Sequence, residues 1–158
     1  PLGRGGAIRK GMAFVPKEEE YVLVMNGDII SHENPSSIIS TYLNRREICP
    51  AHVGTIMVTP FTSPYGLVDI DSHGDIISFR EKCSLPYWIN AGIYVFSGSI
   101  KLELPEIGDH ETGTFPKLAE QGLLNAHYSE NFWRSIDSLK DLKETENHLV
   151  LHGYVGRG

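Results

Sequence analysis

The sequence predicts a mixed α/β fold in a single domain. An apolar run at residues 21–25, a helical pattern after Asn34 and a β-branched run from His52 give a strand, a helix and a second strand in order. The alternating pattern of residues 67–79 then predicts a β-hairpin. A chain of 158 residues is long enough to bury one core. Strand, helix and strand in succession are typical of a βαβ unit.

The first dozen residues predict a loop. Four glycines fall within the segment PLGRGGAIRKGM, a density that disfavours a helix. Because glycine has no side chain, we expect a loop that another backbone or a ligand approaches closely.

Residues 21–59 contain the predicted strand, helix and strand. The run YVLVM lacks polar alternation, which is typical of a strand buried on both faces of a parallel sheet. Asn34 before Pro35 is suited to cap and begin a helix. The run HVGTIMVTPF predicts the next buried strand, and we expect Pro60 to end it.

The rest of the chain predicts a hairpin, two helices and a short strand. Residues 67–71 and 75–79 flank the turn sequence Ser-His-Gly-Asp. We expect a helix at residues 115–120 and a strand in the segment NFWRSID. Ser138 and Asp141 resemble a capping pair that begins the last helix.

Composition disfavours several classes of partner and site. A formal net charge of -6 argues against a surface for nucleic acid or anionic membrane, although a local basic cluster could still bind a small anion. We expect no membrane span and no leader peptide, because the required apolar stretches are missing. Two isolated cysteines favour a reducing cytoplasmic setting without a disulfide. Seven scattered histidines disfavour a histidine metal site.

Several carboxylates stand where strands are expected to end. Asp28 follows the first strand, and ligands of α/β sheets bind beyond the carboxyl ends of strands. It could bind Mg²⁺, which prefers oxygen ligands, or belong to an ordinary Asn-Gly-Asp turn. Asp137 could equally serve the dipole of the helix that follows it. Asp69 and Asp71 match the Asp-x-Asp pattern of sugar-transferring enzymes weakly, because alternate residues of a hairpin strand share its solvent face.

Glu81 and Lys82 are adjacent charges at the exit of the predicted hairpin. Neighbouring residues of a strand point to opposite faces, so a simple ion pair between them is not expected. If the strand ends beside a crevice, Glu81 could accept hydrogen bonds from sugar hydroxyls while Lys82 neutralises a phosphate. Two solvated charges at a strand exit are the alternative.

Five segments, in order along the chain, resemble the sugar-1-phosphate nucleotidyltransferase family. They are PLGRGGAI, VMNGDI, YGLVDIDSHGDIISFREK, INAGIYVF and FWRSIDSLKDLKETEN. They are similar to the family's Pro-Leu-Gly-Thr-x-Gly-Ala loop, its Asn-Gly-Asp strand end, its Tyr-Gly-Val hairpin running into Phe-x-Glu-Lys, its Asn-Ala-Gly strand, and its closing tryptophan-containing strand and helix. Mannose-1-phosphate guanylyltransferase-like and glucose-1-phosphate thymidylyltransferase-like enzymes belong to this family.

The resemblance implies a fold and a reaction. The fold would be a three-layer, Rossmann-like sheet of the GT-A kind, with residues 1–149 as a partial catalytic domain and residues 150–158 as a C-terminal tail. A nucleotidyl group would pass from a nucleoside triphosphate to a sugar-1-phosphate, giving pyrophosphate and a GDP-mannose-like or dTDP-glucose-like nucleotide sugar. Mg²⁺ would be the cofactor. A homo-oligomer is compatible with the family, and nucleic acid and membrane partners are not expected.

The resemblance also implies roles for matching positions. Asp28 and Asp137 would hold Mg²⁺, although a second alignment places Ser135 rather than Asp137 at the metal position. Asp28 and Lys82 would be catalytic. The implied substrate contacts are Glu81 and Asn90 with sugar hydroxyls, Lys82 with the sugar phosphate, the Gly66 backbone with the hexose, and Gly3 and Gly6 with the nucleotide base.

The chain departs from the family pattern in ways that lead to further expectations. The family begins with a strand and a Gly-x-Gly-Thr-Arg-Leu loop that carries the triphosphate, and this chain starts after them. We therefore expect weak or absent activity in isolation. Arg4 replaces a threonine, and Cys83 replaces the proline that usually follows Glu-Lys. The alternatives are a catalytically silent regulatory or sugar-nucleotide-binding paralogue, and a metal-dependent glycosyltransferase that uses Asp69 and Asp71.

Overall fold

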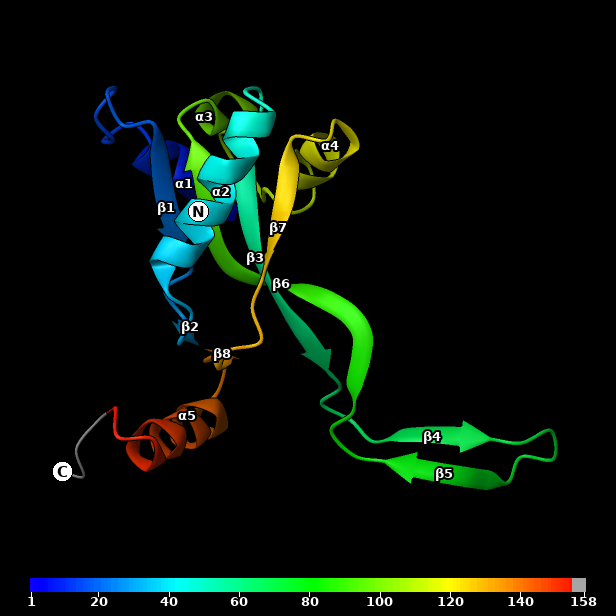
Figure 1. The fold of residues 1–158 in the computed structure, drawn as a ribbon. Helices are drawn as coiled ribbons and strands as arrows, with labels where there is room; N and C mark the ends of the chain where they lie inside the picture. Colours follow the sequence, from blue (N-terminus) through cyan, green and yellow to red (C-terminus); the bar gives the residue numbers. More distant parts are fainter. Residues whose placement is uncertain (155–158) are drawn as a thin grey trace.

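The computed structural model describes residues 1–154 and has a four-stranded mixed sheet at its centre. The strands of this sheet are β1 (Tyr21–Met25), β3 (Gly54–Thr62), β6 (Ser84–Ser97) and β7 (Leu124–Tyr128). Their spatial order is β1-β6-β3-β7 (Figure 1). β6 runs antiparallel to both β1 and β3, whereas β7 runs parallel to β3. The predicted mixed α/β fold is confirmed.

Helices cover both faces of this sheet. α1 (Gly3–Gly11), α3 (Ile100–Glu103) and α4 (Thr114–Glu120) pack on one face, and α2 (Pro35–Ile48) packs on the other. The last helix, α5 (Leu139–Leu151), lies apart from this sheet, beside the short strand at residues 133–135 (Figure 1). Alternate residues of β6 pack on opposite faces. Tyr94 and Phe96 join a core cluster with α3 and α4, and Val95 joins a second cluster with α2. The sheet is therefore the middle of three layers.

Two smaller antiparallel pairs extend beyond the central sheet. β2 (Ile29–Ser31) pairs with β8 (Trp133–Ser135), and β4 (Leu67–Ile70) pairs with β5 (Ile76–Arg80). The β4–β5 hairpin confirms the predicted one and projects away from the rest of the molecule (Figure 1). Its turn forms because Asp71 Oδ1 accepts backbone hydrogen bonds from His73 and Asp75, while Gly74 adopts a φ of +92°.

Both predicted helix starts are confirmed. Asn34 Oδ1 accepts a hydrogen bond of 3.0 Å from the Ser36 amide, and Pro35 occupies the first helical position of α2. Ser138 Oγ accepts from the Asp141 amide at 3.2 Å and donates to Asp141 Oδ2 at 2.6 Å. These caps satisfy amides that have no partner within their own helix.

The predicted N-terminal loop is wrong, because residues 3–11 form the helix α1. The glycines instead allow α1 to lie directly against the backbone of residues 106–108. A Cβ on Gly6 would lie 2.4 Å from the Glu106 carbonyl oxygen, and the Gly5 amide donates to the Gly108 carbonyl at 3.0 Å. Tertiary packing thus outweighs the low helix propensity of glycine.

Two expectations about the central strands also need correction. β1 is not buried on both faces, since Leu23 and Met25 are 39% and 49% exposed. β1 and β3 are parallel but not adjacent, because β6 lies between them. Pro60 does not end β3 but lies inside it, next to a register shift, where a strand tolerates proline.

The C-terminal part of the chain ends in α5. This helix extends to Leu151, so it crosses the predicted start of the tail at residue 150. Residues 155–158 of that tail lie outside the described residues. Among residues 1–154, no helix has the length and apolar character required to cross a membrane.

Candidate functional site

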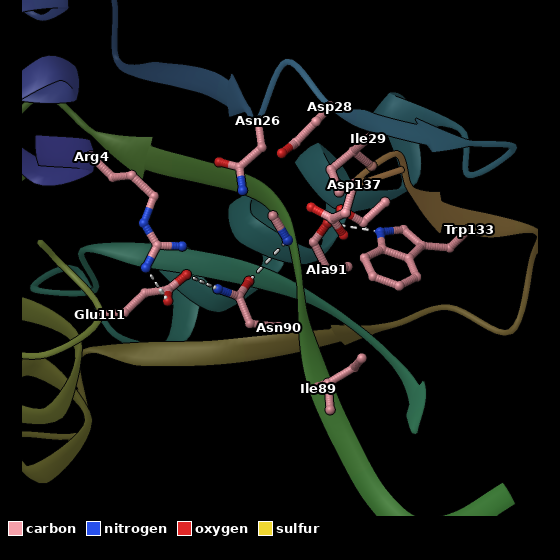
Figure 2. Close-up of a pocket in the computed structure, with 12 residues that line it drawn as sticks. Arg4, Asn26, Asp28, Ile29, Ile89, Asn90, Ala91, Glu111, Trp133 and Asp137 are labelled. Carbon is pink, nitrogen blue, oxygen red and sulfur yellow. Dashed lines mark hydrogen bonds and ion pairs between the residues drawn. The ribbon is translucent and has the colours of Figure 1, made fainter. Parts of the chain in front are cut away.

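A cavity of about 430 Å³ opens where β1, β2, β6 and β8 approach one another (Figure 2). Its walls carry three acidic side chains, an arginine and two side-chain amides, next to a tryptophan. The lining residues are Arg4, Asn26, Asp28, Ile29, Ile89, Asn90, Ala91, Gly92, Glu111, Trp133, Ser135 and Asp137.

Strand pairing brings Asp28 and Asp137 to the same cavity. Ile29 pairs with Ser135 in the β2–β8 ladder, and the Ile136 amide donates a 2.8 Å hydrogen bond to the Asp28 carbonyl. Figure 2 shows both carboxylates on the side of the cavity that Trp133 occupies. The two carboxylates predicted to bind metal therefore line one space, although the sequence separates them widely.

The oxygen donors on this side of the cavity suit a hard divalent cation. Besides the two carboxylates, the amide of Asn26 and the hydroxyl of Ser135 line the same space. Within residues 1–154, no group of three or more His, Cys, Asp and Glu side chains could hold a metal ion. Mg²⁺ is commonly bound through one or two carboxylates, with water and substrate phosphate completing the shell. The donor set therefore fits Mg²⁺ held jointly by protein and substrate.

Asn90, predicted to contact sugar hydroxyls, lines the cavity with its carboxamide fixed on both sides. Its Nδ2 donates to Tyr94 Oη at 2.9 Å and to Glu111 Oε1 at 2.7 Å, and its Oδ1 accepts from the Gly92 amide at 3.0 Å. Burial raises the pKa of Tyr94 to about 12, so its hydroxyl stays protonated at neutral pH. One lone pair of Asn90 Oδ1 remains for a ligand donor.

Arg4 and Glu111 form the opposite side of the cavity, and sequence reasoning assigned a role to neither. Arg4 Nη2 lies 2.7 Å from Glu111 Oε2, and Arg4 also donates to Asp109. The hydrogen bond to Asp109 raises the pKa of Arg4, which keeps the guanidinium charged. The Glu111 amide and Arg4 lower the pKa of Asp109. No local pattern marks Glu111, because its placement depends on the packing of residues 105–113 against α1.

Close backbone contacts shape the rest of the cavity. Gly92 has a φ of +72°, and a Cβ there would lie 2.7 Å from Asn26 Nδ2. The Asn26 amide donates to the Gly92 carbonyl at 2.8 Å, and Trp133 Nε1 donates to the Ala91 carbonyl at 2.8 Å. These bonds join β1 and β8 to the middle of β6. Gly92, the glycine of the Asn-Ala-Gly segment, therefore cannot be replaced without strain, because its φ is positive and Asn26 occupies the space of a Cβ.

Three of the predicted substrate-binding residues lie at the base of the β4–β5 hairpin rather than in the cavity. The described residues that line the cavity do not include Gly66, Glu81 or Lys82. The ring of Phe79 covers Gly66, where a Cβ would lie 2.5 Å from Phe79 Cζ. Lys82 has a φ of +52°, a left-handed conformation that is uncommon for residues other than glycine.

The predicted nucleotide-binding glycines, Gly3 and Gly6, lie in α1 on either side of Arg4. Both face the chain's own backbone, since a Cβ on Gly3 would lie 2.4 Å from the Gly108 carbonyl oxygen. Only Arg4 of this trio lines the cavity. The backbone that approaches these two glycines is therefore that of the chain itself. Their contact with a nucleotide base stays a prediction.

Asp69 and Asp71 have structural roles in the hairpin. Asp69 pairs with Arg80 Nη2 at 3.1 Å, and Asp71 holds the turn. Neither residue lines the cavity. The crevice location that a glycosyltransferase would need for these two acids is therefore not found among the described residues.

Comparison with known proteins identifies relatives of one kind. The family model described as nucleotidyl transferase matches residues 1–150. The catalytic subunit beta of mannose-1-phosphate guanylyltransferase from Drosophila melanogaster is 31% identical over 147 residues, covering 89% of this chain and 38% of that protein. UTP–glucose-1-phosphate uridylyltransferase from Synechocystis is 28% identical over 128 residues, covering 77% of this chain and 33% of that protein. The chain thus spans about a third of the length of these relatives.

Solved structures agree on the fold. The crystal structure of HddC from Yersinia pseudotuberculosis superposes with a TM-score of 0.67 at 24% identity, covering 94% of this chain and 63% of that one. The same protein has been solved in complex with GMP-PN, with a TM-score of 0.65. The predicted family resemblance is confirmed by the match of the family model over nearly the whole chain. The chain belongs to the sugar-1-phosphate nucleotidyltransferase family.

Proposed function

We propose that this chain acts in the transfer of a nucleotidyl group from a nucleoside triphosphate to a sugar-1-phosphate. The observation that carries the proposal is the meeting of Asp28 and Asp137 at one cavity, opposite the fixed amide of Asn90. Two carboxylates suit a cation that neutralises phosphate, and an amide suits a sugar hydroxyl. One cavity therefore offers groups for both parts of a sugar phosphate.

Within this class, our first choice of substrates is mannose-1-phosphate with GTP, giving a GDP-mannose-like product. The likeness to the Drosophila guanylyltransferase, at 31% identity, supports this choice. A thymidylyl transfer that gives a dTDP-glucose-like product is the second choice.

The reaction depends on positioning the two substrates and neutralising their phosphate charge more than on a general base. A phosphate oxygen of the sugar-1-phosphate forms a bond to the α-phosphorus of the nucleotide, and the bond from that phosphorus to the bridging oxygen breaks to release pyrophosphate. The second pKa of a phosphate monoester is about 6, so the nucleophile is already ionised at neutral pH. When bound, Mg²⁺ supplies charge neutralisation to the phosphates.

The side chains of this chain would then bind and orient the substrates. Asp28 and Asp137 hold the cation, and Asn90 Oδ1 accepts a hydrogen bond from a sugar hydroxyl. Glu81 accepts from further hydroxyls, and Lys82 contributes its charge to the sugar phosphate. The left-handed backbone of Lys82 supports a functional role, because such conformations cost energy and cluster at functional sites.

Binding and turnover are best tested separately, since the chain spans about a third of the length of its curated relatives. Calorimetric titration of the chain with mannose-1-phosphate in the presence of Mg²⁺ should show binding, and Asp28→Asn with Asp137→Asn should abolish its Mg²⁺ dependence. The matched control is Asp69→Asn, which removes a carboxylate outside the cavity. Equal binding by all variants would reject the site.

A pyrophosphate-release assay on a protein extended upstream then tests the reaction itself. Turnover with a sugar-1-phosphate and a nucleoside triphosphate, lost in Asp28→Asn, supports the transferase. Substrate binding without any turnover would favour the alternative of a catalytically silent, sugar-nucleotide-binding paralogue. A panel of nucleotides and sugars in the same assay tests the choice of GTP and mannose-1-phosphate.

A further inference from the structure

The β4–β5 hairpin exposes an apolar surface on one of its two faces. Val68 pairs with Phe79 and Ile70 pairs with Ile76, so the members of each pair share a face. The register shift beyond Asp69 leaves Ile77 without a partner, on the same side as Phe79 by alternation. We call this surface the hairpin face, and it consists of Val68, Ile70, Ile76, Ile77 and Phe79, which are 41% to 68% exposed.

The other face of the hairpin is polar. Asp69 and Arg80 lie there and form an ion pair, Ser78 is the ladder partner of Asp69, and the half-buried Leu67 is the partner of Arg80. Within residues 1–154, β4 and β5 pack mainly on each other, and Figure 1 shows the hairpin projecting away from the sheet. Two-stranded hairpins alone are marginally stable in water, and exposed apolar patches mark interaction sites. The hairpin face therefore has the character of an interaction surface.

We propose that the hairpin face is a self-association surface, on which the same face of a second copy of this chain packs. From their exposed fractions, the five side chains leave roughly 500–600 Å² uncovered, so two copies would bury about 1,100 Å². That area reaches the lower limit for a specific interface. A twofold axis brings the two identical patches together and closes the assembly at a dimer.

The charges around the hairpin favour a second copy over an arbitrary apolar partner. The tip carries Asp71 and Asp75, whereas the base carries Lys82 next to Glu81, and Arg80, which is already paired with Asp69. Packing tip against tip would place four carboxylates together. Antiparallel packing instead separates the two acidic tips and places each tip near Lys82 at the base of the other copy, and the twofold axis repeats this arrangement. Antiparallel packing of two copies therefore covers the apolar face while keeping the acidic tips apart.

The direct test is the mass of the chain in solution. Sedimentation equilibrium at about 100 μM, a concentration that saturates a micromolar dimer, should give twice the 17.6 kDa chain mass. Ile77→Lys should raise the dimer dissociation constant at least about tenfold, because it buries an unpaired charge. The control is Ile48→Lys, which introduces the same charge at a residue of α2 that is 76% exposed, and it should leave the dimer intact. A monomeric wild-type chain, or an unaffected Ile77→Lys dimer, would overturn the proposal.

A second measurement needs no substitution, so it remains valid if a variant fails to fold. Hydrogen exchange of the amides of residues 67–80 should slow as the chain concentration rises through the dimer range, while exchange in α2 stays constant. Charge reversal tests the orientation. Asp75→Lys should weaken the dimer, and combining it with Lys82→Glu should restore part of the affinity. Association without hairpin protection would place the interface elsewhere and refute the proposal.

Discussion

Replacing Glu33 should destabilise the fold, because this buried carboxylate joins two segments that lead to the site. The side chain is 8% exposed and follows β2. Ser129 Oγ donates to it at 2.5 Å and Asn131 Nδ2 at 2.7 Å, and His127 Nε2 lies 3.4 Å away. The donors precede β8, and Asp137 follows that strand by two residues. Glu33 therefore ties the segment after β2 to the segment before β8.

The expected loss follows from the bonds that Glu33→Ala removes. Hydrogen bonds to a charged group contribute about 1.5–3 kcal/mol each, and some of the freed donors regain water, so we expect a loss of about 2–4 kcal/mol. In a domain of this size, that lowers Tm by roughly 5–15 °C. Glu33→Gln keeps an acceptor oxygen, so about half of that loss is expected. The exposed Glu19→Ala should change stability by less than about 0.5 kcal/mol.

The pH dependence of the effect gives an independent check. Burial would raise the pKa of Glu33, but hydrogen bonds from Ser129, Asn131 and His127 outweigh it and lower the pKa below the ordinary 4.5. A carboxylate with a lowered folded-state pKa stabilises fully above its unfolded pKa and loses that contribution as pH falls through the folded value. Urea unfolding followed by circular dichroism should therefore show the difference between wild type and Glu33→Gln at neutral pH and a smaller difference below about pH 4. An unchanged stability at neutral pH, or a difference that grows in acid, would refute the reasoning.

Four further substitutions test other contacts. Trp133→Phe removes the donor to the Ala91 carbonyl and should cost about 1 kcal/mol in urea unfolding. Glu111→Ala removes a partner of the Asn90 amide, so the Asn90 side-chain NH₂ should exchange faster by NMR and mannose-1-phosphate should bind more weakly, with Glu106→Ala as the exposed control. Gly6→Ala places a Cβ against the Glu106 carbonyl and should destabilise the chain by more than about 2 kcal/mol, whereas a purely nucleotide-contacting glycine would leave stability unchanged. Lys82→Gly relieves a left-handed backbone and should stabilise the chain by about 1 kcal/mol while weakening sugar-1-phosphate binding; unchanged binding would remove Lys82 from the site.

Features of the fold that depend on neighbouring residues could be predicted from the sequence. The cap at Asn34 and the turn between β4 and β5 form through contacts within a few residues, and the strand before Asp28 is visible as a local apolar run although it pairs with the distant β6. Asp28 and Asp137 could be nominated for the same reason, since each follows a strand that is visible locally. Their meeting in one cavity depends on the β2–β8 pairing, and only the family resemblance indicated it beforehand.

Contacts between distant segments account for what the sequence did not reveal. Arg4 and Glu111 meet because α1 packs on residues 105–110, and the same packing turns a glycine-rich segment into a helix. The glycine content of a segment indicates that another group can approach its backbone closely. It does not indicate which segment or ligand that group belongs to. The expected loop and the overlooked Glu111 therefore have one cause, namely an unpredicted helix-to-loop contact.

Lys82 and Asn90 illustrate how far motif spacing can locate a site. Lys82 precedes β6, whereas Asn90 lies near the middle of that strand. A straight strand rises about 3.3 Å per residue, which would separate the two by about 26 Å, farther than one hexose phosphate extends. β6 curves markedly, and its pairing with β3 shifts register at Ile56/Val58 and again at Pro60/Thr62 (Figure 1). Such irregularities bend strands. The proposed phosphate contact of Lys82 thus requires this bend to carry the hairpin base toward the cavity, a property of paired strands that no linear motif encodes.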